Sequence, residues 1–134
     1  MIQPFLVWSD WAIFVLRVVV ALTLIRHGLP KLKDLRGTGG WFESVGFRPG
    51  AFWALVAGLT ETLGGLAMLL GFLTQLAALL VALEFVVILV KFRGSKMFAK
   101  DAELEWLILA AALALMTLGS GALSLNSYFG LIVY

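Results

Sequence analysis

Two glutamates interrupt the long apolar stretches of this chain, and they are the residues with the clearest capacity for chemistry. Glu61 is the one charged residue in residues 51–71, and Glu84 is the one charged residue in residues 73–90. About 20 helical residues, rising ~1.5 Å each, cross the ~30 Å hydrocarbon core of a bilayer. A carboxylate there costs at least ~2.5 kcal/mol, so it needs a cationic partner or a proton. Buried ionisable groups of this kind usually mark a functional site.

Arg17 is the candidate partner for Glu61, because it lies inside the first apolar stretch at a similar depth. Most residues at helical spacing from Glu61 are small, which lets helices approach closely and turns Glu61 towards the protein interior. We therefore expect an Arg17–Glu61 pair. Two interpretations stay open: an ion pair that only fixes how the helices pack, and a polar site for a small molecule.

Glu84 has larger helical neighbours and no basic residue at its own depth. Desolvation and the nearby charge of Glu61 both disfavour its ionised form, so we expect Glu84 to be protonated at neutral pH. Two roles are equally consistent with this expectation. The carboxyl group forms a hydrogen bond within the protein or at a contact between copies of the chain, or it relays protons.

Four further candidates lie where apolar stretches meet the loops: Glu105, Arg26, His27 and Lys31. An interfacial salt bridge between Glu105 and Arg26 is favoured over a ligand-binding role. His27 is expected to be an interfacial side chain rather than a ligand. Lys31 is expected to extend towards the lipid head groups.

The composition places these residues in a membrane protein. The chain has 134 residues, is 62% hydrophobic and has a mean hydropathy of +1.03, well above the values of soluble domains. Residues 1–134 are predicted to form a single all-α domain, a membrane four-helix bundle. Its helices are expected at about residues 8–27, 51–71, 73–91 and 103–123. The N-terminus lacks the basic region and cleavage site of a secretory signal, so we expect it to be retained.

The distribution of lysine and arginine predicts the orientation. The loop between helices one and two and the loop between helices three and four each hold four basic residues, whereas the N-terminal stub, the tight turn at 72–74 and the C-terminal tail hold none. The positive-inside rule puts both basic loops in the cytoplasm and both termini outside the bacterial inner (plasma) membrane. This bias accounts for the isoelectric point of 9.2 without a nucleic-acid partner, and a lipid surface is the expected partner.

The loops also have predictable structure. The turn at residues 71–74 is so short that helices two and three should form an antiparallel hairpin. Residues 38–46 are predicted to form a short interfacial helix, capped by Thr38 and ended by Gly46. Residues 122–134 are too short to span and are expected to lie along the outer interface.

The order and spacing of several motifs resemble the DoxX family of small bacterial four-helix membrane proteins over nearly the whole chain. The motifs are Arg17, His27-Gly28-x-x-Lys31, Glu61-x-x-Gly64-Gly65, Leu70-Gly71-x-x-Thr74, Glu105 and Gly119-x-Gly121-x-x-Ser124-Leu125. The resemblance implies association with quinone-linked oxidoreductase systems, including a thiosulfate:quinone oxidoreductase, and with membrane complexes in oxidative-stress defence. The sequence departs from the family at Asn126, where aspartate is common, and at Glu84, an added carboxyl group.

Missing residue types limit the mechanism. The chain has no cysteine and one histidine, which excludes an iron–sulfur cluster or bis-histidine haem held by this chain alone, and no metal site is expected. The resemblance therefore favours a membrane subunit that binds quinone or anchors a redox partner protein; whether the chain is itself an enzyme stays open. The alternatives are a proton-coupled small-molecule carrier, which would need to form a homo-oligomer, and a non-catalytic scaffold or assembly factor.

Overall fold

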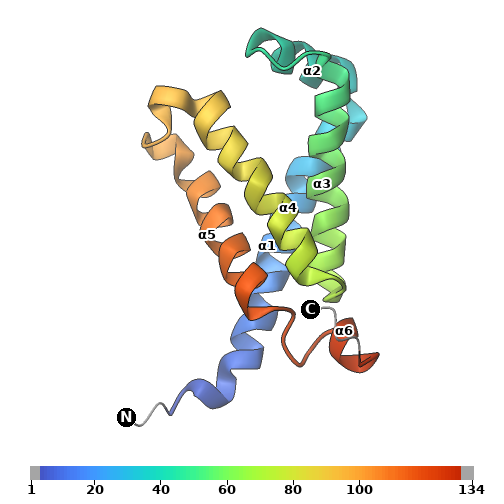
Figure 1. Ribbon diagram of the computed structural model, residues 1–134, viewed down its shortest axis with the longest axis vertical. Coiled ribbons are helices and arrows are strands. Elements are labelled where there is room, and N and C mark those ends of the chain that lie inside the picture. The colour runs from blue at the N-terminus through green and yellow to red at the C-terminus, as the bar shows by residue number, and fades with distance from the viewer. Residues whose placement is uncertain (1–3, 131–134) are drawn as a thin grey trace.

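The computed structural model describes residues 4–130 and is helical without strands over that range (Figure 1). Short 3-10 turns lie at Leu6–Trp8, Gly94–Lys96 and Lys100–Ala102, and a π-helical segment, Ile88–Arg93, continues α4. The α-helices are α1 (Ser9–Lys33), α2 (Leu35–Ser44), α3 (Gly50–Leu70), α4 (Thr74–Val87), α5 (Glu103–Leu118) and α6 (Leu125–Tyr128).

Three helical stretches of the described chain are long and apolar enough to cross a membrane: Leu6–Lys33, Gly50–Leu70 and Thr74–Lys96. Their outward faces carry many exposed leucine, valine and aromatic side chains, as lipid contact requires. The fourth long helix, α5, has 16 residues. At ~1.5 Å per residue it is shorter than the ~30 Å hydrocarbon core.

Glycines bring α1 and α3 into close contact. A methyl group on Gly28 would lie 2.5 Å from Thr62 Oγ1 and 2.9 Å from Glu61 Cβ. A methyl group on Gly65 would lie 2.9 Å from the carbonyl oxygen of Ala21. Only glycine fits at such approaches, which is how membrane helices gain packing contacts that lipid cannot replace.

The α3–α4 turn is held by the C-terminal segment. Gly71 adopts φ +68° and ends α3, and the Phe72 N–H donates to the carbonyl of Ala67 at 2.8 Å. The side chain of Asn126 accepts a hydrogen bond from the Leu73 N–H at 3.2 Å, and the Asn126 N–H donates to the carbonyl of Gly71 at 3.1 Å. The short helix α6 is thereby fastened to the turn.

The helices diverge away from this turn. In Figure 1, α3 and α4 meet at residues 71–73 and separate towards the end that carries α2 and the α4–α5 loop. Helix α4 packs on α5, and α2 packs on the beginning of α3. The buried core is composed mainly of alanine, leucine and valine from α1, α4 and α5, with Met68 from α3 and Phe85 from α4.

Several predicted boundaries change. Helix α1 continues through Pro30 to Lys33, six residues beyond the expected end, and α5 ends at Leu118 rather than near residue 123. The helix predicted at residues 38–46 is α2, which begins at Leu35, and its cap is Asp34, which accepts a hydrogen bond from the Gly37 N–H at 2.9 Å. The prediction of Thr38 as the cap was wrong, because Asp34 already satisfies the first turn.

Candidate functional site

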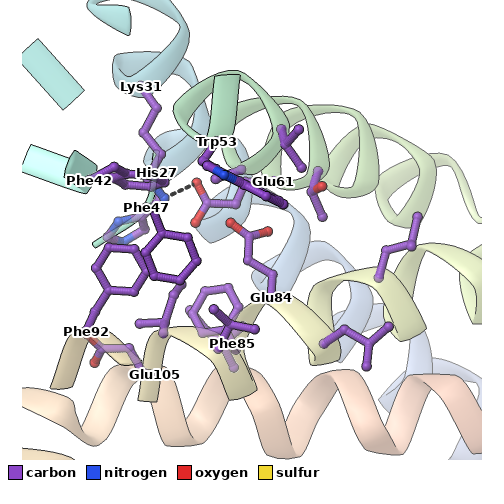
Figure 2. A pocket seen from close by; sticks show the side chains of 18 of the residues that line it. His27, Lys31, Phe42, Phe47, Trp53, Glu61, Glu84, Phe85, Phe92 and Glu105 are labelled. Carbon is purple, nitrogen blue, oxygen red and sulfur yellow. Dashed lines mark hydrogen bonds and ion pairs between the residues drawn. The ribbon is translucent and has the colours of Figure 1, made fainter. Parts of the chain in front are cut away.

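A cavity of about 520 Å³ opens where α3 and α4 diverge (Figure 2). Side chains from all five longer α-helices, the α2–α3 loop and the π-helical segment line it. The lining residues are His27, Lys31, Trp41, Phe42, Phe47, Trp53, Val56, Ala57, Thr60, Glu61, Leu80, Leu83, Glu84, Phe85, Val87, Ile88, Phe92, Leu104, Glu105 and Ile108. Its volume lies in the ~300–1,000 Å³ range of small-molecule sites, and its wall has their usual mix of apolar residues and a few polar groups.

Lys31 and Glu61 form the most buried ion pair described. Lys31 Nζ lies 2.5 Å from Glu61 Oε2, and the two side chains are 22% and 2% exposed. The extension of α1 beyond Gly28 makes this contact, because it carries Lys31 alongside α3. The expectation that Lys31 extends to the lipid head groups was therefore wrong.

Arg17 does not pair with Glu61, so this prediction was also wrong. The Arg17 guanidinium is 1% exposed and donates hydrogen bonds to the carbonyl oxygens of Ser120 and Leu123, the latter at 2.8 Å. It does not line the cavity. The segment after α5 folds back over the helix ends and supplies these carbonyl acceptors. The sequences of the apolar stretches alone do not predict this fold-back. Residues 122–130 consequently do more than lie along an interface; residues 131–134 fall outside the described residues.

Glu84 faces Glu61 from the other wall of the cavity. Figure 2 shows the two carboxyl groups pointing towards each other from α4 and α3. Both oxygens of Glu84 are shielded from solvent and have no hydrogen-bond partner within the described part of the chain. The tight turn between α3 and α4 explains why the two carboxyl groups face each other, since it places Glu61 and Glu84 at similar distances along two antiparallel helices.

Glu105 pairs with Arg93, not with Arg26 as predicted. Arg93 Nε and Nη2 lie 3.1 Å and 2.5 Å from Glu105 Oε1, and Arg93 Nη1 lies 2.6 Å from Asp101 Oδ2. Arg26 sits on an exposed face of α1, whereas Arg93 ends the π-helical segment beside α5. The Arg93 guanidinium holds the pKa of the exposed Asp101 carboxyl below its usual value, by hydrogen bonding first and by charge second.

Aromatic side chains close one end of the cavity, and the sequence analysis did not assign them to a site. The Phe92 ring stacks on Phe47 (4.9 Å between centroids, 11° between planes) and on Trp41 (4.9 Å, 29°), and lies 5.0 Å from Phe42. Phe92 is placed by the π-helical segment, a helix type that occurs often at functional sites. The high proportion of aromatic residues in residues 41–53 was the feature of the sequence that could have predicted this aromatic wall.

The remaining candidates are distributed as follows. His27 lines the cavity from α1, and Arg26 does not. Among residues 4–130, no three histidine, cysteine, aspartate or glutamate side chains gather as a group that would hold a metal ion. The cavity therefore contains one buried ion pair, one carboxyl paired at its edge, one carboxyl without a partner, and an aromatic wall.

These features define a small helical membrane protein with a mostly apolar cavity between its helices. The family model named DoxX matches residues 12–94, so the chain belongs to the DoxX family, as the motifs predicted. The chain is also 29% identical over 113 residues to a protein of Bacillus subtilis (strain 168) whose name is "Putative oxidoreductase CatD", covering 84% of this chain and 83% of the relative. No solved structure matches the chain significantly.

Proposed function

We propose that this protein is an integral membrane subunit of a quinone-linked oxidoreductase system and that the cavity holds the quinone head group. The observation that carries the proposal is the cavity itself, in which an apolar and aromatic wall surrounds the Glu84 carboxyl and the Lys31–Glu61 pair. A quinone needs an apolar surface for its ring and tail and hydrogen-bond donors for its carbonyl oxygens. The oxidoreductase name of the Bacillus relative supports the same class.

Each polar group has a defined part in this proposal. A protonated Glu84 donates a hydrogen bond to one carbonyl oxygen of the ring, and the Lys31 ammonium group donates from the opposite wall. Phe47 and Phe92 offer ring faces for stacking. The chain contains no cysteine, so electrons reach the quinone from a redox partner protein that this subunit anchors.

The proposal includes a topology. The Glu103–Leu118 helix completes four spanning segments when the adjoining 3-10 turn, Lys100–Ala102, is included. Both basic loops face the cytoplasm and both termini face outwards across the plasma membrane of a bacterium. The cavity then lies near the cytoplasmic side, where a soluble redox partner has access.

Quinone extraction tests the proposal. The protein, purified in mild detergent, is expected to retain quinone, measured by mass spectrometry of the solvent extract and by native mass spectrometry of the intact complex. Ala57→Trp fills the cavity and should abolish retention. Ala110→Trp, on an exposed position of α5 outside the cavity, should retain it. Equal quinone content in the two variants, or none in the unaltered protein after reconstitution with excess quinone, would contradict the proposal.

A further inference from the structure

The carboxyl groups of the cavity differ in their charge compensation. Glu61 is paired with Lys31 and Glu105 with Arg93, each at a closest distance of 2.5 Å. Glu84 has no basic partner among the described residues, and neither of its oxygens accepts a hydrogen bond. An ionised Glu84 therefore leaves one negative charge uncompensated in the cavity. Such a charge is removed either by a proton or by a cation that enters the site.

The surrounding wall selects the type of cation. Six aromatic residues line the cavity, and aromatic ring faces attract cations that have lost their water. These residues are Trp41, Phe42, Phe47, Trp53, Phe85 and Phe92. The remaining wall is mostly aliphatic and offers few oxygen ligands, so a hydrated metal ion gains little there. A large cation with delocalised charge loses less hydration and gains contact over the whole apolar surface.

We infer that this cavity binds amphipathic aromatic cations, with ionised Glu84 as the opposite charge and the aromatic residues as the contact surface. A bulky organic cation need not donate a hydrogen bond to the Glu84 carboxylate, because opposite charges attract over several ångströms in a medium of low dielectric constant. Binding exchanges one proton: the Glu84 carboxylic acid becomes a carboxylate, and the proton leaves to solvent as the cation enters. The inference goes beyond quinone binding, since it involves no electron transfer and does not depend on the proposed function.

The other charged groups around Glu84 are compatible with a one-for-one exchange. Helix α3 presents Glu61, α1 presents Lys31 and His27, and α5 presents Glu105. Lys31 and Glu61 cancel each other, and Glu105 is cancelled by Arg93. Glu84 is thus the carboxyl group whose negative charge a bound cation can neutralise. In Figure 2 its carboxyl group points towards the carboxyl group of Glu61.

Two ions of the same shape and opposite charge test the inference in the purified full-length protein. In lipid nanodiscs, tetraphenylphosphonium should bind to the protein and tetraphenylborate should not, as measured by equilibrium dialysis with empty nanodiscs as the reference. In the pH range where Glu84 is protonated, affinity for tetraphenylphosphonium should fall about tenfold for each unit by which the pH is lowered. Calorimetry in buffers of different ionisation enthalpy should report one proton released for each cation bound. Equal binding of the two ions, or binding of the cation independent of pH, would overturn the inference.

The substitution Glu84→Gln separates charge from shape. It should reduce tetraphenylphosphonium affinity at least tenfold, because glutamine keeps nearly the size of the side chain and cannot carry the negative charge. The matched control is Glu103→Gln, which removes an exposed carboxylate at the start of α5 and should bind the cation normally. Undiminished cation binding by Glu84→Gln would show that the site does not use this charge. If the unaltered protein binds the cation but retains no quinone, the proposed function is refuted and this inference is not.

Discussion

Lys31 on α1 and Glu61 on α3 form an ion pair, 2.5 Å between Nζ and Oε2, that joins two membrane helices at the wall of the cavity. Its partners are unequally buried. The Glu61 side chain is 2% exposed, whereas the Lys31 side chain is 22% exposed and lies near the end of its helix. This inequality decides what each substitution should do.

Removing Lys31 should be the more damaging change. Lys31→Met leaves Glu61 as an unpaired buried charge and should cost about 3–5 kcal/mol of stability. Glu61→Gln should cost less, because the long Lys31 side chain can extend to the interface. The double variant should be more stable than Lys31→Met alone, as measured by thermal unfolding in detergent. Lys33→Met, at an exposed position of the same helix, is the control, and strictly additive effects of the two substitutions would argue against the pair.

Arg17 should determine whether the C-terminal segment stays attached. Its guanidinium donates to two backbone carbonyls, and lysine cannot reproduce this forked geometry. Arg17→Lys is therefore expected to cost about 2–3 kcal/mol and to expose residues after Gly119 to limited proteolysis. Arg26→Lys, on an exposed face of α1, should leave the digestion pattern unchanged. An identical digestion pattern for Arg17→Lys and the unaltered protein would contradict this role.

The contact between α1 and α3 should not tolerate a side chain at Gly28. Gly28→Ala places a methyl group 2.5 Å from Thr62 Oγ1 and 2.9 Å from the backbone carbonyl of Gly58, so the helices must separate, at a cost of about 1–3 kcal/mol. Gly40→Ala meets no atom within 4 Å and should be neutral or stabilising by up to ~1 kcal/mol, because alanine favours helix. A lower melting temperature for Gly40→Ala than for Gly28→Ala would count against the packing described.

The proposed orientation can be read from single cysteines, since the chain has none of its own. Phe98 in the α4–α5 loop and Tyr128 in α6 are 81% and 82% exposed. A membrane-impermeant maleimide should label Tyr128→Cys in spheroplasts and should label Phe98→Cys only after permeabilisation. The opposite pattern would invert the topology.

The membrane class and the carboxyl groups of the site were evident from the sequence. Apolar stretches of bilayer length, each interrupted by one glutamate, are local properties that do not depend on how helices meet. The short turn at residues 71–74 also predicted that Glu61 and Glu84 lie at similar depth, and both line one cavity in the structure. Helical spacing sets position and face along a single helix, which is why the sequence alone could place the two carboxyl groups near each other.

Only the tertiary structure decided which charges pair. Lys31 reaches Glu61 because α1 continues past Pro30, and Arg17 binds carbonyls because the segment after α5 folds back over the helix ends. Arg93 reaches Glu105 because a π-helical segment extends α4 beside α5. Ion pairs and hydrogen bonds form over about 3 Å, a distance fixed by the packing of separate helices. Spacing along the sequence gives each charged group its depth in the membrane, and it leaves the choice among partners of similar depth to that packing.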